Sequence, residues 1–541
     1  MFSFDVIKVC YVKNQREIKM RKAQLFLTVL SLFMIGILPS QDIPSVTGVE
    51  VTTDTQLLES PDFYKQNPYP ITLKQVINKT LANNLDIRIS DYDRRIAEYE
   101  IEAQKGIYDL EFESKINATN IEDPQPSKNS ALTNSTSQNI NYGGEASLSQ
   151  LLPTGAVVGF TYELDKTKTN SAFVDYSTYY TQDASVFLQQ PLLKNFGRDV
   201  TESGIDIARN NNEISQEAYL LEAQNQIASV SKAYWSLVYA IKNYEVQRLS
   251  LKQARDFLRI TRVSYETGVL PRTDVLQAEA QVAMREENVI IAESVIKSSE
   301  DNLKLFMNIP RASKDWDRYY LPIDEPDVKQ IAVDQNRFLE DAFENRPDYR
   351  QAELSIDNKT IQKKVAANQK MPELNLSAYA GRSGLGVSHD DAWDELNTYD
   401  YHSYDFSLEF KFPLQNRKGK YNYKQAALEE EKAEISLRDL ENRIIFEVRN
   451  AIRQLRTEKK RIQATSVSVE AQKAKLDAEL QRYRVGKSTS YNVLEFQQDY
   501  AEALSHLIQS KVNFNKALID LYKSRGIILS SFNINDSGEF E

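Results

Sequence analysis

The residues that most often carry chemistry are few and scattered in this chain. Its three histidines, His389, His402 and His506, lack the spacing of a metal-binding motif. Its one cysteine, Cys10, can form neither an intrachain disulfide nor a cysteine-based metal site. The sequence also contains no glycine-rich phosphate loop and no G-x-S-x-G nucleophile motif. These observations predict a protein without enzyme activity, metal or cofactor.

Two glycine-containing turns gather the residues that could instead join helices or contact a partner. The first group is Tyr265, Gly268, Thr273, Asp274, Val275 and Leu276. The second group is Tyr483, Gly486, Ser488, Asn492, Val493, Leu494 and Glu495. We expect Gly268 and Gly486 to end their helices in the left-handed conformation that glycine adopts easily. From the residues alone, each segment remains either a simple turn or a functional tip.

The second turn belongs to an internal repeat. Gly268 recurs as Gly486, and Val275-Leu276 recurs as Val493-Leu494, each 218 positions later (486 − 268). Agreement at one fixed offset over more than about forty residues is the mark of a duplicated unit. Each copy is expected to contain a helix, strands, a long helix, a tight turn and a return helix.

Long helices are expected to position both turns. A helix over residues 205–265 would be roughly 90 Å long at ~1.5 Å per residue. After a turn at 268–271, the return helix to residue 308 would be shorter, and a helix at 348–370 would stack end to end with it, so that the two together match the long helix. Residues 310–345 would fill the junction where they meet. This arrangement predicts the wall of a tall cylinder.

Apolar residues in the long helices recur every seven positions, which is typical of coiled-coil seams. The residues in these rows are Ile227, Tyr234 and Ile241 with Val230, Leu237 and Tyr244 in the first copy, and Ile445 and Ile452 with Val448, Leu455 and Ile462 in the second.

The segments before each long helix alternate between apolar and polar residues. Examples are Phe112 and Ile116, Val186 and Leu188, and Phe406, Leu408 and Phe410. Period-two alternation predicts strands with one apolar face, as in a membrane barrel, although a soluble sandwich has the same pattern. An extra hairpin is expected at residues 142–151 and 157–164, and polar loops at 122–138, 166–180 and 381–402.

The N-terminus predicts export from the cytoplasm. Met20-Arg21-Lys22 precedes an apolar run that ends at Leu38, the pattern of a secretory signal peptide. No later segment approaches the ~18 apolar residues of a membrane-spanning helix, so any span would consist of strands. The net charge of -11 argues against binding to nucleic acid.

Several motifs, in this order and partly doubled, resemble the TolC-type outer membrane efflux protein family. They are Asn83-Asn84-Leu85-Asp86, Gln190-Pro191-Leu192-Leu193, Arg346-Pro347-Asp348 and the two tip motifs. The fold implied is mainly α with a membrane β-barrel, a duplicated helix–strands–helix–helix unit that forms a long periplasmic coiled-coil α-barrel and a β-barrel shared by a trimer. The expected divisions are a signal peptide at 1–41 (with Met20 as an alternative start), an extended segment at 42–70, repeats at 71–309 and 346–529, an equatorial segment at 310–345 and a tail at 530–541.

The resemblance implies an outer-membrane exit duct of a tripartite efflux or type I secretion system. Its partners would be two further copies of the chain, a periplasmic adaptor, an inner-membrane RND or ABC transporter and outer-membrane lipid. A periplasmic adaptor and a structural coiled-coil protein without a pore remain the alternatives. The exported substrate and the transporter class stay open.

The resemblance also assigns roles at the tips, where an adaptor would dock and the duct would close. A tyrosine before the second turn bonds an aspartate after the first, which implies Tyr483 and Asp274 here. Acidic residues that line the narrowest ring fall on Asn492 and Glu495, and a basic partner falls on Ser488. We therefore expect Asp274, Tyr483 and Glu495 at the entrance constriction, with a weaker closing network. Three Glu495 carboxylates on one axis would repel one another.

Overall fold

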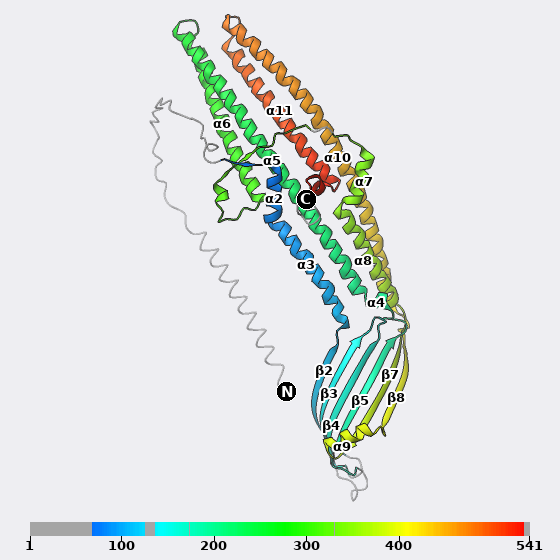
Figure 1. Cartoon of the computed structure of the whole chain (residues 1–541). Coiled ribbons are helices and arrows are strands. Elements are labelled where there is room, and N and C mark those ends of the chain that lie inside the picture. The colour runs from blue at the N-terminus through cyan, green and yellow to red at the C-terminus, as the bar shows by residue number, and fades with distance from the viewer. Residues whose placement is uncertain (1–67, 125–135, 172–173, 329–330, 535–541) are drawn as a thin grey trace, which may run out of the picture. The chain divides into compact units, whose positions relative to one another are not determined.

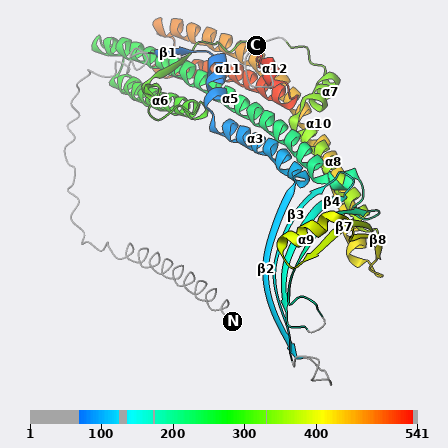
Figure 2. The same ribbon diagram turned by 60° about the horizontal axis from the view of Figure 1, so that its bottom comes forward.

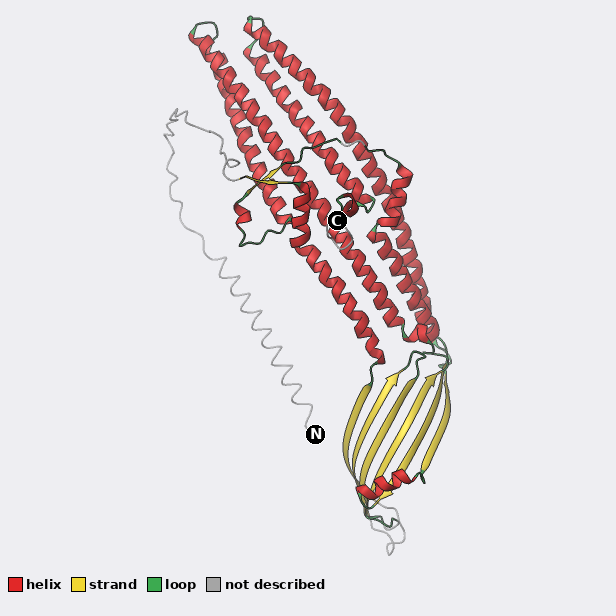
Figure 3. Ribbon diagram, viewed as in Figure 1, coloured by secondary structure: helices red, strands yellow, loops and turns green. Residues whose placement is uncertain are grey.

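The computed structural model describes residues 68–124, 136–171, 174–328 and 331–534. The predicted signal peptide, Cys10, nearly all of the extended segment and residues 535–541 lie outside this part of the chain. Helices and strands segregate, with the main sheet at one end of the helices (Figures 1 and 3).

The main sheet contains six antiparallel strands in the order β2-β3-β4-β5-β7-β8. Their bounds are β2 Glu111–Pro124, β3 Thr136–Leu151, β4 Val157–Thr169, β5 Thr178–Pro191, β7 Glu373–Gly386 and β8 His402–Lys411. The expected extra hairpin is β3 and β4, which lie inside this sheet. Both repeats thus contribute to one sheet, whose two edges are β2 and β8.

The two faces of the sheet differ in polarity, as the alternation predicted. One face, called the apolar face below, carries Phe112, Ile116, Leu148, Val158, Phe160, Leu164, Val186, Leu188, Leu376, Phe406, Leu408 and Phe410. The other, called the polar face, carries Glu113, Lys115, Glu145, Glu163, Asp165, Asp183, Asp405 and Glu409. Strands that separate polarity in this way can stand between two different environments.

Each repeat contains one long helix flanked by two shorter ones. The first set is α3 Leu85–Lys105, α5 Ser203–Glu266 and α6 Arg272–Phe306; the second is α8 Pro347–Gln369, α10 Arg417–Arg484 and α11 Ser490–Ser524. The 64 residues of α5 span about 96 Å and the 68 residues of α10 about 102 Å. α3 and α6 pack along α5, and α8 and α11 pack along α10, so two short helices line each long one. The sequence predicted that the return helix to residue 308 stacks with the helix at 348–370; in the structure α6 instead shares α5 with α3, and α8 shares α10 with α11. α5 also contacts α8 and α11, which joins the repeats.

The helix seams bury most of the expected rows. Ile227, Val230, Tyr234 and Leu237 are each 0% exposed in the largest apolar cluster. In α10, Val448, Ile452 and Leu455 are buried as expected, but Ile444 rather than Ile445 is the buried isoleucine before them. Ile444, Val448 and Ile452 follow one another at four-residue intervals, so this spacing and not the seven-residue one selects the buried isoleucine.

An equatorial layer surrounds the middle of the helices. It contains β1 Pro68–Ile71, α2 Leu73–Asn83, η2 Lys314–Asp317, β6 Tyr319–Pro322, α7 Gln335–Asn345 and α12 Ile528–Ser531. β1 and β6 pair in parallel. The Tyr234 hydroxyl lies 2.6 Å from an Asp324 carboxylate oxygen, and burial with this bond raises the pKa of Tyr234. The layer is therefore tied into the core of α5.

All three of the expected loops contain regular structure. Residues 381–402 include the end of β7 and a helix, α9 His389–Thr398, which packs across β5 and β7 (Figure 2). The loop prediction was wrong there because Ser388 caps a short helix whose Ala392 and Leu396 are buried. The loop at 166–180 was also too long, since β4 continues to Thr169 and β5 starts at Thr178. The loop at 122–138 was too long for the same reason, since β2 continues to Pro124 and β3 starts at Thr136. The short helix η1 Gly106–Tyr108 links α3 to β2, and α4 Arg198–Thr201 links β5 to the long helix α5.

Candidate functional site: the paired helix tips

The first tip joins α5 to α6. Gly268 has a φ of +77°, and a Cβ at this position would meet nothing within 4 Å, so the turn requires glycine for its backbone conformation alone. The Val269 amide donates to the Ser264 carbonyl oxygen at 2.9 Å, which closes the end of α5. Pro271 then precedes the first turn of α6, where Asp274 lies.

The second tip repeats this geometry between α10 and α11. Gly486 has a φ of +74°, and the Lys487 amide donates to the Arg482 carbonyl oxygen at 2.9 Å. Thr489 caps α11 by accepting a hydrogen bond from the Asn492 amide at 3.4 Å. Equivalent residues of the duplicated unit thus form equivalent turns.

A chain of hydroxyl groups connects the two tips. The Ser490 hydroxyl donates to an Asp274 carboxylate oxygen at 3.2 Å, and it lies 3.3 Å from the Tyr483 hydroxyl. Because Ser490 has only one hydroxyl proton and donates it to Asp274, Tyr483 must donate to Ser490. The structure therefore brings Tyr483 and Asp274 together, but through Ser490 and not by the direct bond that the resemblance implied.

A carboxylate that the sequence did not single out organises the second tip. Glu479 of α10 is only 4% exposed, and it accepts hydrogen bonds from the Ser488 hydroxyl, from Arg482 at 3.1 Å and from Asn492 at 3.4 Å. The Ser488 bond is the largest cause that lowers the pKa of Glu479; burial opposes it, and Arg482 and Asn492 act with it. Ser488 and Asn492, two positions where the family pattern was lost, thus serve a network within one chain.

A small apolar cluster packs the two hairpins against each other below the turns. Phe257 of α5, Ala278 of α6 and Val493 and Leu494 of α11 are buried in it, and the Phe257 and Tyr483 rings lie 5.1 Å apart between centroids. The predicted tip residues therefore differ in exposure. Val275, Val493 and Leu494 are buried in this conformation, and Val493 and Leu494 belong to the cluster between the hairpins.

Six other predicted tip residues are exposed and accessible to a partner, whereas the predicted residues of the two hydrogen-bond networks are half-buried. Tyr265 and Leu276 are 44% and 52% exposed, and Gly268, Thr273, Gly486 and Glu495 are exposed as well. Glu495 forms no hydrogen bond or ion pair with the described residues of its own chain. Its predicted place in a constriction depends on other copies of the chain.

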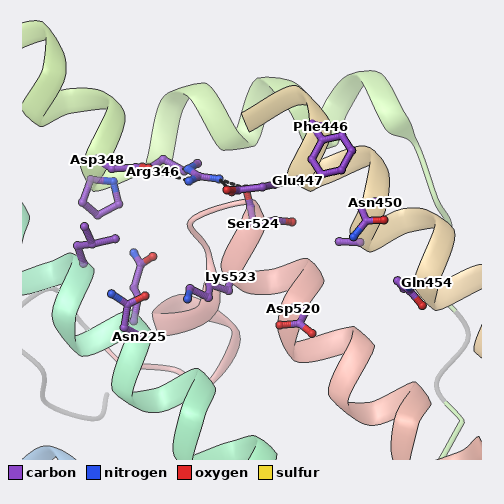
Figure 4. A pocket seen from close by; sticks show the side chains of 14 residues that line it. Asn225, Arg346, Asp348, Phe446, Glu447, Asn450, Gln454, Asp520, Lys523 and Ser524 are labelled. Carbon is purple, nitrogen blue, oxygen red and sulfur yellow. Dashed lines mark hydrogen bonds and ion pairs between the residues drawn. The ribbon is translucent and has the colours of Figure 1, made fainter. Parts of the chain in front are cut away.

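The Arg346-Pro347-Asp348 motif lies at the equator, where it borders a cavity of about 510 Å³ between α5, α8, α10 and α11 (Figure 4). Arg346 binds Asp348 through two hydrogen bonds of 2.9 and 2.7 Å and Glu447 through one of 2.6 Å. Burial lowers the pKa of Arg346, but the bonds to Asp348 and Glu447 outweigh it and raise the pKa. The motif therefore fastens the start of α8 to α10.

Among the described residues, no group of three or more His, Cys, Asp or Glu side chains could hold a metal ion. None of the helices in the described ranges is both long and apolar enough to cross a membrane.

The sequence matches the outer membrane efflux protein family over residues 129–308 and 338–526, which is more than half of the chain. The chain belongs to this family. Its members are outer-membrane channels and not enzymes, and we therefore place this outer membrane efflux protein in the outer membrane. The first matched range lies within the expected repeat at 71–309 but starts after α2, α3 and β2, and the second starts eight residues before the expected repeat at 346–529.

Individual relatives are distant from this outer membrane efflux protein. It is 22% identical to nodulation protein T of Rhizobium leguminosarum bv. trifolii, over 62% of this chain and 69% of that protein. It is also 22% identical to the outer membrane protein TolC of Escherichia coli, over 56% of this chain and 61% of TolC. The alkaline protease secretion protein AprF of Pseudomonas aeruginosa is 20% identical, over 68% of this chain and 74% of AprF.

Solved structures share the fold. The outer-membrane channel OprN superposes with a TM-score of 0.61 at 16% identity, over 84% of this chain and 89% of OprN. The CmeC outer membrane channel of Campylobacter jejuni has a TM-score of 0.61 at 14% identity, over 91% of this chain and 94% of CmeC. The similarity extends over the sheet and the helices together.

Proposed function

We propose that this outer membrane efflux protein is the exit duct of a tripartite efflux or type I secretion system. Three copies would close one β-barrel and one helical tunnel. A periplasmic adaptor would dock at the tips, and an inner-membrane transporter of the RND or ABC class would supply the substrate. The observation that carries the proposal is that a single chain leaves both its sheet and its helix layer open.

The open sheet supports closure by further copies. β2 and β8 each pair on one side only, and their side chains are almost all exposed. Each unpaired backbone group at such an edge costs roughly several kcal/mol in hydrocarbon. An open sheet therefore cannot remain in a bilayer. Pairing of β2 with β8 of the next copy satisfies both edges, and three copies give eighteen strands (three times six).

The helix layer has matching open edges. On α3, which leads into β2, Ile89 and Ile96 are 58% and 64% exposed, in a row with Leu85, Tyr92 and Tyr99. On α10, which follows β8, Leu428 and Ile435 are 65% and 56% exposed, in a seven-residue row with Tyr421. Such rows are the seams through which helices pair. Because each row continues from an edge strand, one neighbour would cover both.

The two rows also fit in register. α3 runs towards the sheet and α10 runs away from it, so the pair would be antiparallel (Figure 1). Counting residues from the ends of β2 and β8 places Ile96 at about the level of Leu428, and Ile89 one heptad away at the level of Ile435. Apolar residues thus face apolar residues at these two positions.

The sheet faces suit a wet duct in lipid. The apolar face would contact lipid, and the polar face, with more carboxylates than lysines, would line the lumen. At the other end, the exposed tip residues would contact the adaptor, and the Tyr483–Ser490–Asp274 chain would hold the two hairpins of each copy together. This arrangement gives the entrance a bond that a partner could break.

Planar-bilayer recordings on purified protein test the proposal. We expect a heat-sensitive trimer on gels, and a conductance that favours cations because the polar face is acidic. A monomer that stays in the soluble fraction and adds no conductance would contradict the proposal.

A further inference from the structure

A hollow interrupts the apolar face of the sheet away from the helices. It is a groove of about 460 Å³ over β2 to β5, and its lining includes Ile116, Ala118, Tyr142, Gly144, Leu164, Lys166 and Tyr180. By their strand positions, these seven residues all belong to the apolar face. The tips, the equatorial cavity and the proposed subunit edges make no use of this groove.

Gly144 creates the hollow. In the register of the sheet it lies between Ile116 of β2 and Leu164 of β4, where a side chain would be expected to fill the face. A Cβ on Gly144 would meet nothing within 4 Å, so neither close packing nor a positive φ requires glycine there. The missing side chain leaves an apolar floor with branched side chains on both sides, a shape that fits a hydrocarbon chain.

Positive charge closes the groove at its outer end. Leu164, Lys166 and Lys168 follow one another on the same face of β4, which runs away from the helices. The Lys166 ammonium lies 5.3 Å from the centroid of the Tyr180 ring. This cation–π contact places the charge over the end of the groove without neutralising it. In the described structure, neither lysine forms an ion pair with a carboxylate.

The same level of the sheet has the chemistry of a membrane interface. Tyr142 and Tyr180 lie beside the two lysines, and α9 lies on the same face next to them with Trp393 at 46% exposure. Trp393 makes an edge contact with Tyr162 at 6.3 Å between ring centroids. Tyrosine and tryptophan concentrate where hydrocarbon meets lipid headgroups. The groove therefore runs from the hydrocarbon zone to the headgroup zone.

We propose that this groove binds one phosphate-bearing, anionic lipid of the outer leaflet. An acyl chain would lie over Gly144 between Ile116 and Leu164, and the headgroup phosphate would accept hydrogen bonds from Lys166 and Lys168. The inference rests on the proposed function, because it requires that the apolar face contacts lipid. Continuity with that face selects a lipid as the ligand, and the two lysines select an anionic one.

Lipid titration of purified trimers, followed by native mass spectrometry, tests the site. Dimyristoyl phosphatidylglycerol serves as the anionic probe, phosphatidylcholine with the same acyl chains as the neutral probe, and inorganic phosphate as the headgroup alone. The variants are Lys166→Gln with Lys168→Gln, and Gly144→Leu, which fills the hollow. Lys115→Gln, on the polar face of β2, is the matched control.

We expect the wild type to prefer phosphatidylglycerol. The double lysine variant should weaken binding of that lipid by about twenty-five-fold, because one cation near an anionic membrane surface usually contributes about fivefold. Gly144→Leu should abolish the tightest site for both lipids, and Lys115→Gln should change neither affinity.

Three results would overturn the site: equal affinity for both lipids in the wild type, no effect of the double lysine variant, or competition by millimolar phosphate alone. Conductance recorded on the same samples separates this inference from the proposed function. A conducting trimer without the lysine effect would remove only the lipid site, whereas absence of conductance in the wild type would contradict the duct itself.

Discussion

Ser490 is the residue on which the contact between the two tips depends most directly. Its hydroxyl joins Tyr483 to Asp274, and the side chain is only 2% exposed. Ser490→Ala would leave a half-buried phenol and a carboxylate without their partner, at a cost of about 1 kcal/mol. We expect the hairpins of each copy to separate more easily, so that single-channel conductance rises and channels open more often. Bilayer recordings measure both.

Ser298→Ala provides the control for this change. Ser298 also carries a serine hydroxyl on a hairpin helix, but it bonds to the Val295 carbonyl oxygen of its own helix. Its replacement should leave the conductance unchanged. Equal behaviour of the two alanine variants would show that the hydroxyl chain does not restrain the entrance.

Glu479 makes the second tip sensitive to acid. Its folded pKa lies below the ordinary value of 4.5, so the unfolded tip binds more protons at intermediate pH. The stabilisation is therefore complete above about pH 4.5 and is lost as the pH falls through the lowered pKa. Samples are held briefly at each pH and then digested with trypsin at neutral pH, faster than the tips refold. We expect cleavage at Arg484 and Lys487 to rise only after exposure to a pH below about 4.5.

In Glu479→Gln protein, rapid cleavage should already occur in samples held at neutral pH, with no acid step. Glu470→Gln, an exposed substitution on the same helix, should retain the wild-type profile. If cleavage of the Glu479→Gln variant still rises at acid pH, then a group other than Glu479 causes the acid sensitivity.

At the residue scale, the sequence could predict the turns but not the hydrogen bonds that connect them. Gly268 and Gly486 indicate their turns because a positive φ favours glycine. Ser490 and Glu479 carry no such local signature. Their roles arise from partners on other helices or across a turn, and only the folded hairpins bring those partners within hydrogen-bond distance.

α9 is the element whose position depends most on single glycines. A Cβ on Gly384 would lie 2.1 Å from the Ala392 carbonyl oxygen, so the helix rests directly on β7. Gly384→Ala should lift α9 from the sheet and change the fluorescence of Trp393. Gly144→Ala, on the same face with open space around it, should not.

Trp393→Phe identifies the contribution of this tryptophan to the signal. If Gly384→Ala and Gly144→Ala give the same Trp393 emission, then close packing of α9 on β7 is not what holds the helix.

At the element scale, most of the fold could be predicted because long helices and alternating strands repeat their pattern many times. The seams of α5 and α10 and the faces of β2, β5 and β8 appear in the sequence as periods of seven and two. α9 was missed because ten residues give too few turns for a periodic signal, and its burial depends on glycines in another element.

At the scale of the whole molecule, the central feature is that a single chain leaves the edges of its sheet and of its helix layer open. The sequence predicted strands and helices but left the place of the extra hairpin open, since pairing partners are not encoded in alternation. The structure shows six strands in one sheet, with open edges that continue into exposed apolar rows on α3 and α10. Closure by two further copies is the arrangement that covers both kinds of edge at once.

Disulfide cross-linking of Ile96→Cys with Leu428→Cys tests this closure most directly. α3 and α10 lie at opposite edges of the helix layer in one chain (Figure 1), and the described residues contain no other cysteine. We predict that oxidation in intact outer membranes links the chains into dimers and trimers, which reduction separates on a gel. No such bands should form when Lys418→Cys, which is displaced along α10, replaces Leu428→Cys. Chains that remain monomeric after oxidation, although both cysteines are accessible to a thiol reagent, would contradict it.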